Sequence, residues 1–217
     1  MSDKSPPQDT IRANTDLGDM VRRGKTPPSR INLNPVVTKT AVDLLNLTEE
    51  TADEIVTNAL KGIREISKAD SVCIAQFAAD PENPGAPQIS KLSHSTSVLA
   101  GCSPEGLLGQ SLDQLSWLAA RLDHMRLLEI TDSRSPVEEN REECDLLAGL
   151  GIGAALIGGF SVEDEKIGFL AIFSASPVES WDVDFYLLMK LIGASLASGF
   201  ARLRLQQDLG DIRERDN

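Results

Sequence analysis

The sequence contains few cysteines and few histidines, and this scarcity excludes several classes of protein. The three cysteines, Cys73, Cys102 and Cys144, form no C-x-x-C pair. Their odd number fits a reducing compartment better than a disulfide framework. The two histidines, His94 and His124, lie 30 residues apart, and no spacing resembles a zinc site. We therefore expect no metal.

Long apolar runs are also missing. The longest uncharged run, residues 146–162, has 17 residues and contains five glycines, whereas a membrane-spanning helix needs about 20 predominantly apolar residues. The first residues, "MSDKSPPQDT", lack the apolar core of a signal peptide. We expect a cytoplasmic protein without a membrane segment.

Positive charge is scarce outside the N-terminal segment. The formal net charge is -12, yet residues 1–40 carry about +3 and the remainder about -15 by the same count of ionised side chains. A body this acidic repels phosphate backbones, which excludes nucleic-acid binding by the folded part. Residues 1–35, rich in proline, serine and charge, predict a disordered polar tail. Residues 36–205 then form one domain, and residues 206–217 form a charged helical extension or linker.

Hydrophobic periodicity and turn signals predict an α+β fold. The first part is expected to contain a short helix within residues 36–47, a helix starting at Thr48 or Thr51, and strands at residues 71–77 and 89–97. A mixed helical and irregular segment follows at residues 98–126, and then a short strand ending at Asp132 and a helix from Ser135 to Gly149 or Gly151. The last part is expected to be a β-hairpin connected by residues 161–166 and a long helix from Ser180 to about Leu209.

Small residues mark two places of close packing. The hairpin strands are rich in glycine and alanine, and the last helix contains "GASLASG" at residues 193–199. Small faces allow helices to approach closely. The helical stretch is equally well explained as a dimer contact or as tight packing on the sheet.

Three parts of the sequence together resemble a GAF domain over residues 47–205. The second hairpin strand contains Ile167-Gly168-Phe169-Leu170, and the last helix opens with Trp181-Asp182-Val183-Asp184. Between the first strands and the hairpin, a helix with Trp117 precedes an "I-x-D" strand, Ile130 to Asp132. This middle part is similar to GAF modules upstream of bacterial sensor kinases and cyclic-di-GMP enzymes.

The resemblance implies a central antiparallel sheet, related to that of profilin and PAS domains. The N- and C-terminal helices would cover one face, and a helical or irregular roof would enclose a pocket on the other. We expect the pocket, and any ligand, at His94, Trp117, Ile130, Asp132 and Leu156. The family also implies a homodimer through the terminal helices, for which the expected contacts are Ile55, Leu196, Gly199 and Leu203.

The expected function is that of a non-catalytic sensory or regulatory module, which passes a signal to an output domain or protein. We expect it to bind a small molecule of unknown identity and to require no cofactor. Two alternatives remain: a thiol enzyme similar to the GAF-fold reductase of free methionine sulfoxide, and a ligand-free interaction scaffold.

Bilin attachment at Cys102 is disfavoured because the neighbouring Cys-His dipeptide is missing. The F-x-x-x-D-E string at residues 160–165 is interpreted as a charged turn rather than a cyclic-nucleotide motif. The acidic run Glu138, Glu139, Glu142 and Glu143 is interpreted as a solvated helix start.

Overall fold

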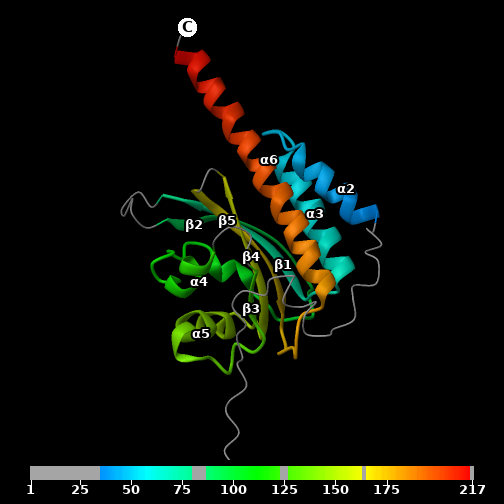
Figure 1. The fold of residues 1–217 in the computed structure, drawn as a ribbon, viewed down its shortest axis with the longest axis vertical. Coiled ribbons are helices and arrows are strands. Elements are labelled where there is room, and N and C mark those ends of the chain that lie inside the picture. The colour runs from blue at the N-terminus through cyan, green and yellow to red at the C-terminus, as the bar shows by residue number, and fades with distance from the viewer. Residues whose placement is uncertain (1–34, 80–86, 123–126, 163–164, 216–217) are drawn as a thin grey trace, which may run out of the picture.

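A computed structural model of the chain describes residues 35–79, 87–122, 127–162 and 165–215, with side chains up to residue 206. Figure 1 shows three layers: a central sheet, the long helices on one face, and a roof of short helices on the other. Of the predicted disordered tail only Pro35 is described, and it begins a helix.

The sheet has five strands in the order β2-β1-β5-β4-β3, and every neighbouring pair is antiparallel. The strands are β1 (Ser71–Ala78), β2 (Gln88–Thr96), β3 (Leu127–Ile130), β4 (Ala154–Val162) and β5 (Glu165–Ser174). This arrangement confirms the α+β class and the central antiparallel sheet.

Helices α3 (Ala52–Ser67) and α6 (Val183–Arg215) cover the first face, and α2 (Pro35–Leu45) packs on these two helices. Of the two predicted starts of α3, Thr51 is confirmed, because it is the N-cap residue of the helix, and Thr48 was wrong. Residues 48–51 form a turn instead, in which the hydroxyls of Thr48 and Thr51 are 2.7 Å apart. The predicted start of α6 at Ser180 was also wrong. At α6, the Asp182 carboxylate accepts the N–H of Asp184 at 3.1 Å, so Asp182 caps the helix.

The roof consists of η1 (Pro104–Leu107), α4 (Ser116–Arg121), η2 (Glu138–Asn140) and α5 (Arg141–Gly149). The predicted helix start at Ser135 was wrong, because the Ser135 hydroxyl donates to Asp132 at 2.9 Å and closes a turn. The predicted stop is confirmed at Gly149. Gly151 follows with a φ of +73°, and an added Cβ there would clash with the backbone carbonyl of Gly101, so this position requires glycine.

The hairpin of β4 and β5 is longer than expected. Six residues were predicted to connect its strands, but Ser161 pairs with Lys166 and Val162 pairs with Glu165. Polar residues are tolerated at these paired positions because the end of the hairpin is accessible to solvent. Residues 163–164, which include the aspartate of the F-x-x-x-D-E string, lie outside the described residues.

The sheet separates two hydrophobic cores, one beneath the long helices and one beneath the roof. Successive side chains of a strand point to opposite faces. Leu156 of β4 therefore lies in the helix-side core, and Ile157 lies in the roof-side core.

The residues expected to form a dimer contact are used within the protomer. Leu196 and Leu203 are buried in the helix-side core, and Ile55 packs against the same core. A Cβ added at Gly199 would clash with the backbone carbonyl of Leu44 in α2. The expectation that Leu196, Gly199 and Leu203 form a dimer contact is therefore corrected: the small face of α6 lies against α2, and not only against the sheet.

Helix α6 contains the one stretch of the described chain with the length and apolar composition of a membrane span, residues Val183–Gln206, at a mean hydropathy of 1.3. It is not a long uncharged run, because Asp184, Lys190, Arg202 and Arg204 interrupt it. Of its most apolar window, 44% is buried inside the protein. The core helix of a globular domain has this same character, so the stretch is weak evidence for a membrane.

Candidate functional site

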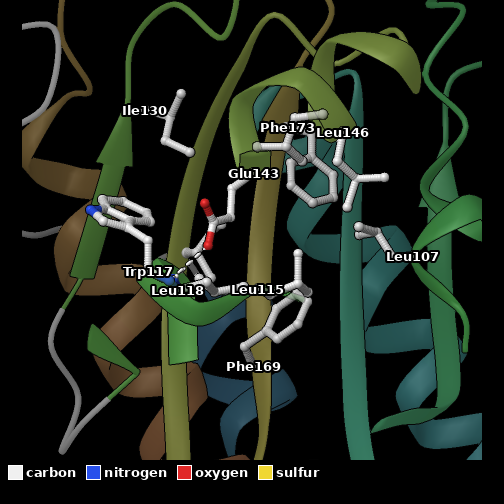
Figure 2. Close-up of a pocket in the computed structure, with 11 residues that line it drawn as sticks. Leu107, Leu115, Trp117, Leu118, Ile130, Glu143, Leu146, Phe169 and Phe173 are labelled. Carbon is white, nitrogen blue, oxygen red and sulfur yellow. Dashed lines mark hydrogen bonds between the residues drawn. The ribbon is translucent and has the colours of Figure 1, made fainter. Parts of the chain in front are cut away.

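A small cavity lies between the roof and the sheet. Its volume is about 20 Å³, room for one or two water molecules. Figure 2 shows the side chains around it, which come from η1, α4, α5 and strands β3, β4 and β5. The lining residues are apolar with one exception: Leu107, Leu115, Trp117, Leu118, Ile130, Glu143, Leu146, Leu147, Ile157, Phe169 and Phe173.

The exception, Glu143, is a carboxylate that is only 5% exposed. Its Oε1 accepts the backbone N–H of Trp117 at 2.8 Å and that of Leu118 at 3.2 Å, drawn as dashed lines in Figure 2. These donors belong to the first turn of α4, where the N-cap residue, Leu115, has no side-chain acceptor. The carboxylate of α5 thus satisfies N–H groups that the sequence of α4 leaves open.

The interpretation of the acidic run as a solvated helix start was wrong for Glu143. Glu138, Glu139 and Glu142 are exposed, as predicted. Glu143 shares the inner face of this segment with Asn140, Cys144 and Leu147, which are all buried. The i, i+3, i+4, i+7 spacing of these four residues was the sequence signal that could have identified it.

Trp117 and Ile130 were predicted at the pocket, and both line the cavity. The Trp117 ring also carries the guanidinium of Arg121, 4.9 Å from its centre, and Arg121 pairs with Glu139 at 3.3 Å. A cation over an indole face is an attractive arrangement. Through Arg121 the Trp117 ring is thus connected to η2.

The other three predicted pocket residues do not line the cavity. Leu156 is on the opposite face of the sheet, and its neighbour Ile157 takes the expected place. The Asp132 carboxylate accepts the N–H of Arg134 and the hydroxyl of Ser135, both at 2.9 Å, so it organises the turn after β3.

His94 lies on the edge strand β2 and connects the sheet to the roof. Its Nε2 is 3.1 Å from a Glu105 carboxylate oxygen of η1, and its Nδ1 is 3.0 Å from the Thr96 hydroxyl. It is not among the side chains around the cavity.

The three cysteines are free and buried. Burial raises the pKa of the Cys73 and Cys102 thiols, with the charge of Asp70 adding to the second shift, and raises that of Cys144 to about 12. Nucleophilic chemistry requires the thiolate, so these thiols are poorly suited to a reductase. None of them lines the cavity.

No group of three or more His, Cys, Asp or Glu side chains suited to a metal ion occurs in the described part of the chain.

No protein-family model matches the sequence, and no curated protein matches it either. Solved structures do match. The phycocyanobilin-bound GAF domain of a cyanobacterial phytochrome is 19% identical with a TM-score of 0.62, and the match covers 81% of this chain and 97% of that one. The phycoerythrobilin-bound GAF domain of a cyanobacterial phytochrome is 19% identical with a TM-score of 0.59, covering 82% and 98%. A far-red-absorbing protein with bound biliverdin is 12% identical with a TM-score of 0.57, covering 78% and 99%.

These comparisons correct one expectation. The expectation that no cofactor is required is contradicted, because all three similar structures hold a bilin. At this level of identity the likeness defines the fold, and it extends over most of the chain. The protein has the fold of a GAF domain.

Proposed function

We propose that this GAF domain is a sensory module that binds a small molecule between its roof and its sheet. The observation that carries the proposal is Glu143, a buried carboxylate in an otherwise apolar cavity. A few polar groups in an apolar concavity are the usual pattern of a ligand site. Domains of similar fold hold their small molecules as bound chromophores.

The lining residues favour a flat, apolar ligand with an N–H donor or a cationic nitrogen. Trp117, Phe169 and Phe173 supply aromatic surface, and Glu143 supplies an acceptor. A bilin shares this chemistry, since its pyrrole nitrogens donate hydrogen bonds. The described residues nevertheless do not fit a covalently attached bilin, because the cavity is too small for a tetrapyrrole and none of the three buried thiols reaches it. We therefore favour a ligand smaller than a tetrapyrrole, held without a covalent bond, for which α4 and the rest of the roof would have to move less.

Thermal unfolding of the full chain with added probes tests the proposal. The probes are a panel of aromatic amines, together with phycocyanobilin and biliverdin. A ligand specific to the folded state raises the melting temperature with its concentration. We expect at least one amine to do so, and the Glu143→Gln variant to bind it about tenfold more weakly, because a hydrogen bond to a charged group is stronger than one to a neutral group.

Glu142→Gln is the matched control, since its neighbouring carboxylate is exposed. No stabilisation by any probe, or equal stabilisation of both variants, would contradict the proposal. A stable visible absorbance after addition of a bilin would instead show that the roof opens far enough for a tetrapyrrole.

We also propose that the domain acts in the cytoplasm as a homodimer and signals to an output domain or protein, as do GAF modules upstream of sensor kinases and cyclic-di-GMP enzymes. The acidic body and the unpaired cysteines are consistent with this location. The C-terminal part of α6 projects beyond the body of the domain (Figure 1). Leu205 follows Leu203, the last buried residue of α6 among those whose side chains are described, and is 63% exposed. The dimer contact would then begin at Leu205, beyond the part of α6 that packs on the domain.

Sedimentation equilibrium tests this dimer. We expect Leu205→Asp to weaken association strongly while leaving the domain folded. Leu108→Asp, which changes an exposed leucine of the roof (53%), should leave it intact. A monomeric wild-type protein would refute the dimer.

A further inference from the structure

The end of the β4–β5 hairpin has little support from the rest of the sheet. Pairing of β1 with β5 stops at Gln76 and Gly168, and pairing of β3 with β4 stops at Leu127 and Gly158. Beyond these points residues 161–162 and 165–166, called here the hairpin end, pair only with each other among the described strands. An isolated two-stranded ribbon is marginally stable in water, so side-chain contacts decide how this one is held.

The base of the hairpin, in contrast, is fixed. A Cβ at Gly168 would clash with the backbone carbonyl of Ala75 and approach the Phe160 ring, so β1 and β4 lie tightly against it. The Phe160 ring stacks on Phe200 of α6 at 5.8 Å. A register shift then separates Phe160 from Ser161. Such bulges bend a strand locally, and this one lies where the supported sheet ends and the hairpin end begins.

On the roof side, the hairpin end holds α4. The Lys166 ammonium donates to the backbone carbonyl of Ala119 at 2.5 Å. This carbonyl lies in the last turn of α4, where a cation is favourable, while the Glu143 carboxylate binds the first turn. Helix α4, which carries Trp117 into the cavity lining, is therefore held by opposite charges at its two ends.

On the helix side, the hairpin end holds α6. The Arg204 guanidinium donates two hydrogen bonds to the Glu165 carboxylate, at 2.5 and 3.0 Å. Neighbouring side chains of a strand point to opposite faces. Glu165 and Lys166 thus connect the same short segment to α6 and to the roof.

We infer that the hairpin end couples the roof to the terminal helix: a displacement of α4 pulls Lys166, tilts the hairpin end at the bulge and loosens Glu165 from Arg204. The ligand part of this inference rests on the proposed function, since a molecule entering the cavity would have to move α4. The mechanical coupling does not depend on a ligand. Arg204 directly follows Leu203, the last buried residue of α6 among those whose side chains are described, so a change at Arg204 can be passed on along the exposed end of the helix.

Amide hydrogen exchange of the full chain, without ligand, tests the coupling. The variants are Lys166→Met and Glu165→Gln, singly and together. Energetic coupling is reciprocal, so Lys166→Met should speed exchange around Arg204, and Glu165→Gln should speed exchange in α4. For partly exposed charged contacts we expect changes of about two- to fivefold at the distant site. In the double variant the increases should be smaller than the product of the single effects.

Two controls keep the result decisive. Lys91→Met removes a surface ion pair with Asp53 (2.6 Å) on the edge strand β2 and should affect neither α4 nor α6. Lys166→Arg keeps the cation and should restore most of the protection around Arg204. If Lys166→Met does not fold, Glu165→Gln alone decides, because its side chain is largely exposed.

Changes confined to the helix that each residue touches would overturn the inference. Because no ligand is added, a failure of this coupling is distinct from a failure of ligand binding.

Discussion

Replacement of Glu143 by alanine should destabilise the domain more than any other single change in its acidic segment. The change removes the acceptor of two buried N–H groups, at 2.8 and 3.2 Å. An unsatisfied buried donor costs about 1–3 kcal/mol. Because the cavity has room for one or two waters that could bind one donor, we expect a total loss of about 2–4 kcal/mol in the free energy of unfolding. Glu143→Gln keeps an acceptor in place and should lose about 1–2 kcal/mol.

Urea denaturation of the full chain, followed by circular dichroism and by tryptophan fluorescence, measures these changes. Glu142→Ala is the control, and exposed changes of this kind usually stay within about 0.5 kcal/mol of wild type. If Glu143→Ala and Glu142→Ala were equally stable within this margin, the carboxylate would not hold α4, and the assignment of Glu143 to the roof would be wrong.

Further predictions concern the terminal helix, pH and the cysteines. Gly199→Ala should lower the free energy of unfolding by about 1–3 kcal/mol, because the added Cβ would clash with Leu44. Gly193→Ala, whose Cβ meets nothing within 4 Å, should raise the free energy of unfolding by up to about 1 kcal/mol. Equal effects of the two substitutions would refute the close contact of α2 and α6. Hydrogen bonding to Arg204 lowers the pKa of Glu165, so the pair stabilises the fold above the ordinary glutamate pKa of about 4.3, and this contribution disappears as the pH falls through the lowered pKa. The contribution is below about 1 kcal/mol, because both groups are exposed. The free energies of unfolding of wild type and Glu165→Gln, measured by urea denaturation, should therefore converge at low pH, and a difference that is constant with pH would contradict this. Alkylation of the three cysteines at pH 8, followed by mass spectrometry, should be roughly a hundredfold slower in the native than in the unfolded protein, because it requires local opening; native labelling at the unfolded rate would contradict their burial.

Strand positions and the inner face of α3 could be predicted because each depends on a local period. Val56, Ala59, Leu60 and Ile63 recur at helical spacing, and all four are buried. The helix starts at Thr48 and Ser180 could not be decided in this way, because several neighbouring residues can serve as caps. Tertiary packing selects between such residues.

The candidate site was only partly predictable for a related reason. Trp117 and Ile130 lie in segments whose place over the sheet follows from the order of elements. Leu156 was misplaced because a shift of one residue in a strand moves a side chain to the other face. Glu143 was missed because its partners, the N–H groups of Trp117 and Leu118, come from a helix more than 20 residues away. The helical spacing of Asn140, Glu143, Cys144 and Leu147 could have placed Glu143 on the inner face of α5, but no local pattern reveals which distant N–H groups it binds.

The cavity as a ligand site is the central claim, and native mass spectrometry of the full chain purified from its natural host tests it most directly. Wild type and Glu143→Gln are compared under the same conditions. We predict that wild type carries an additional small-molecule mass that is lost on unfolding and is reduced in the variant. A wild-type protein with only its sequence mass, or an additional mass retained equally by the variant, would contradict a ligand held at Glu143.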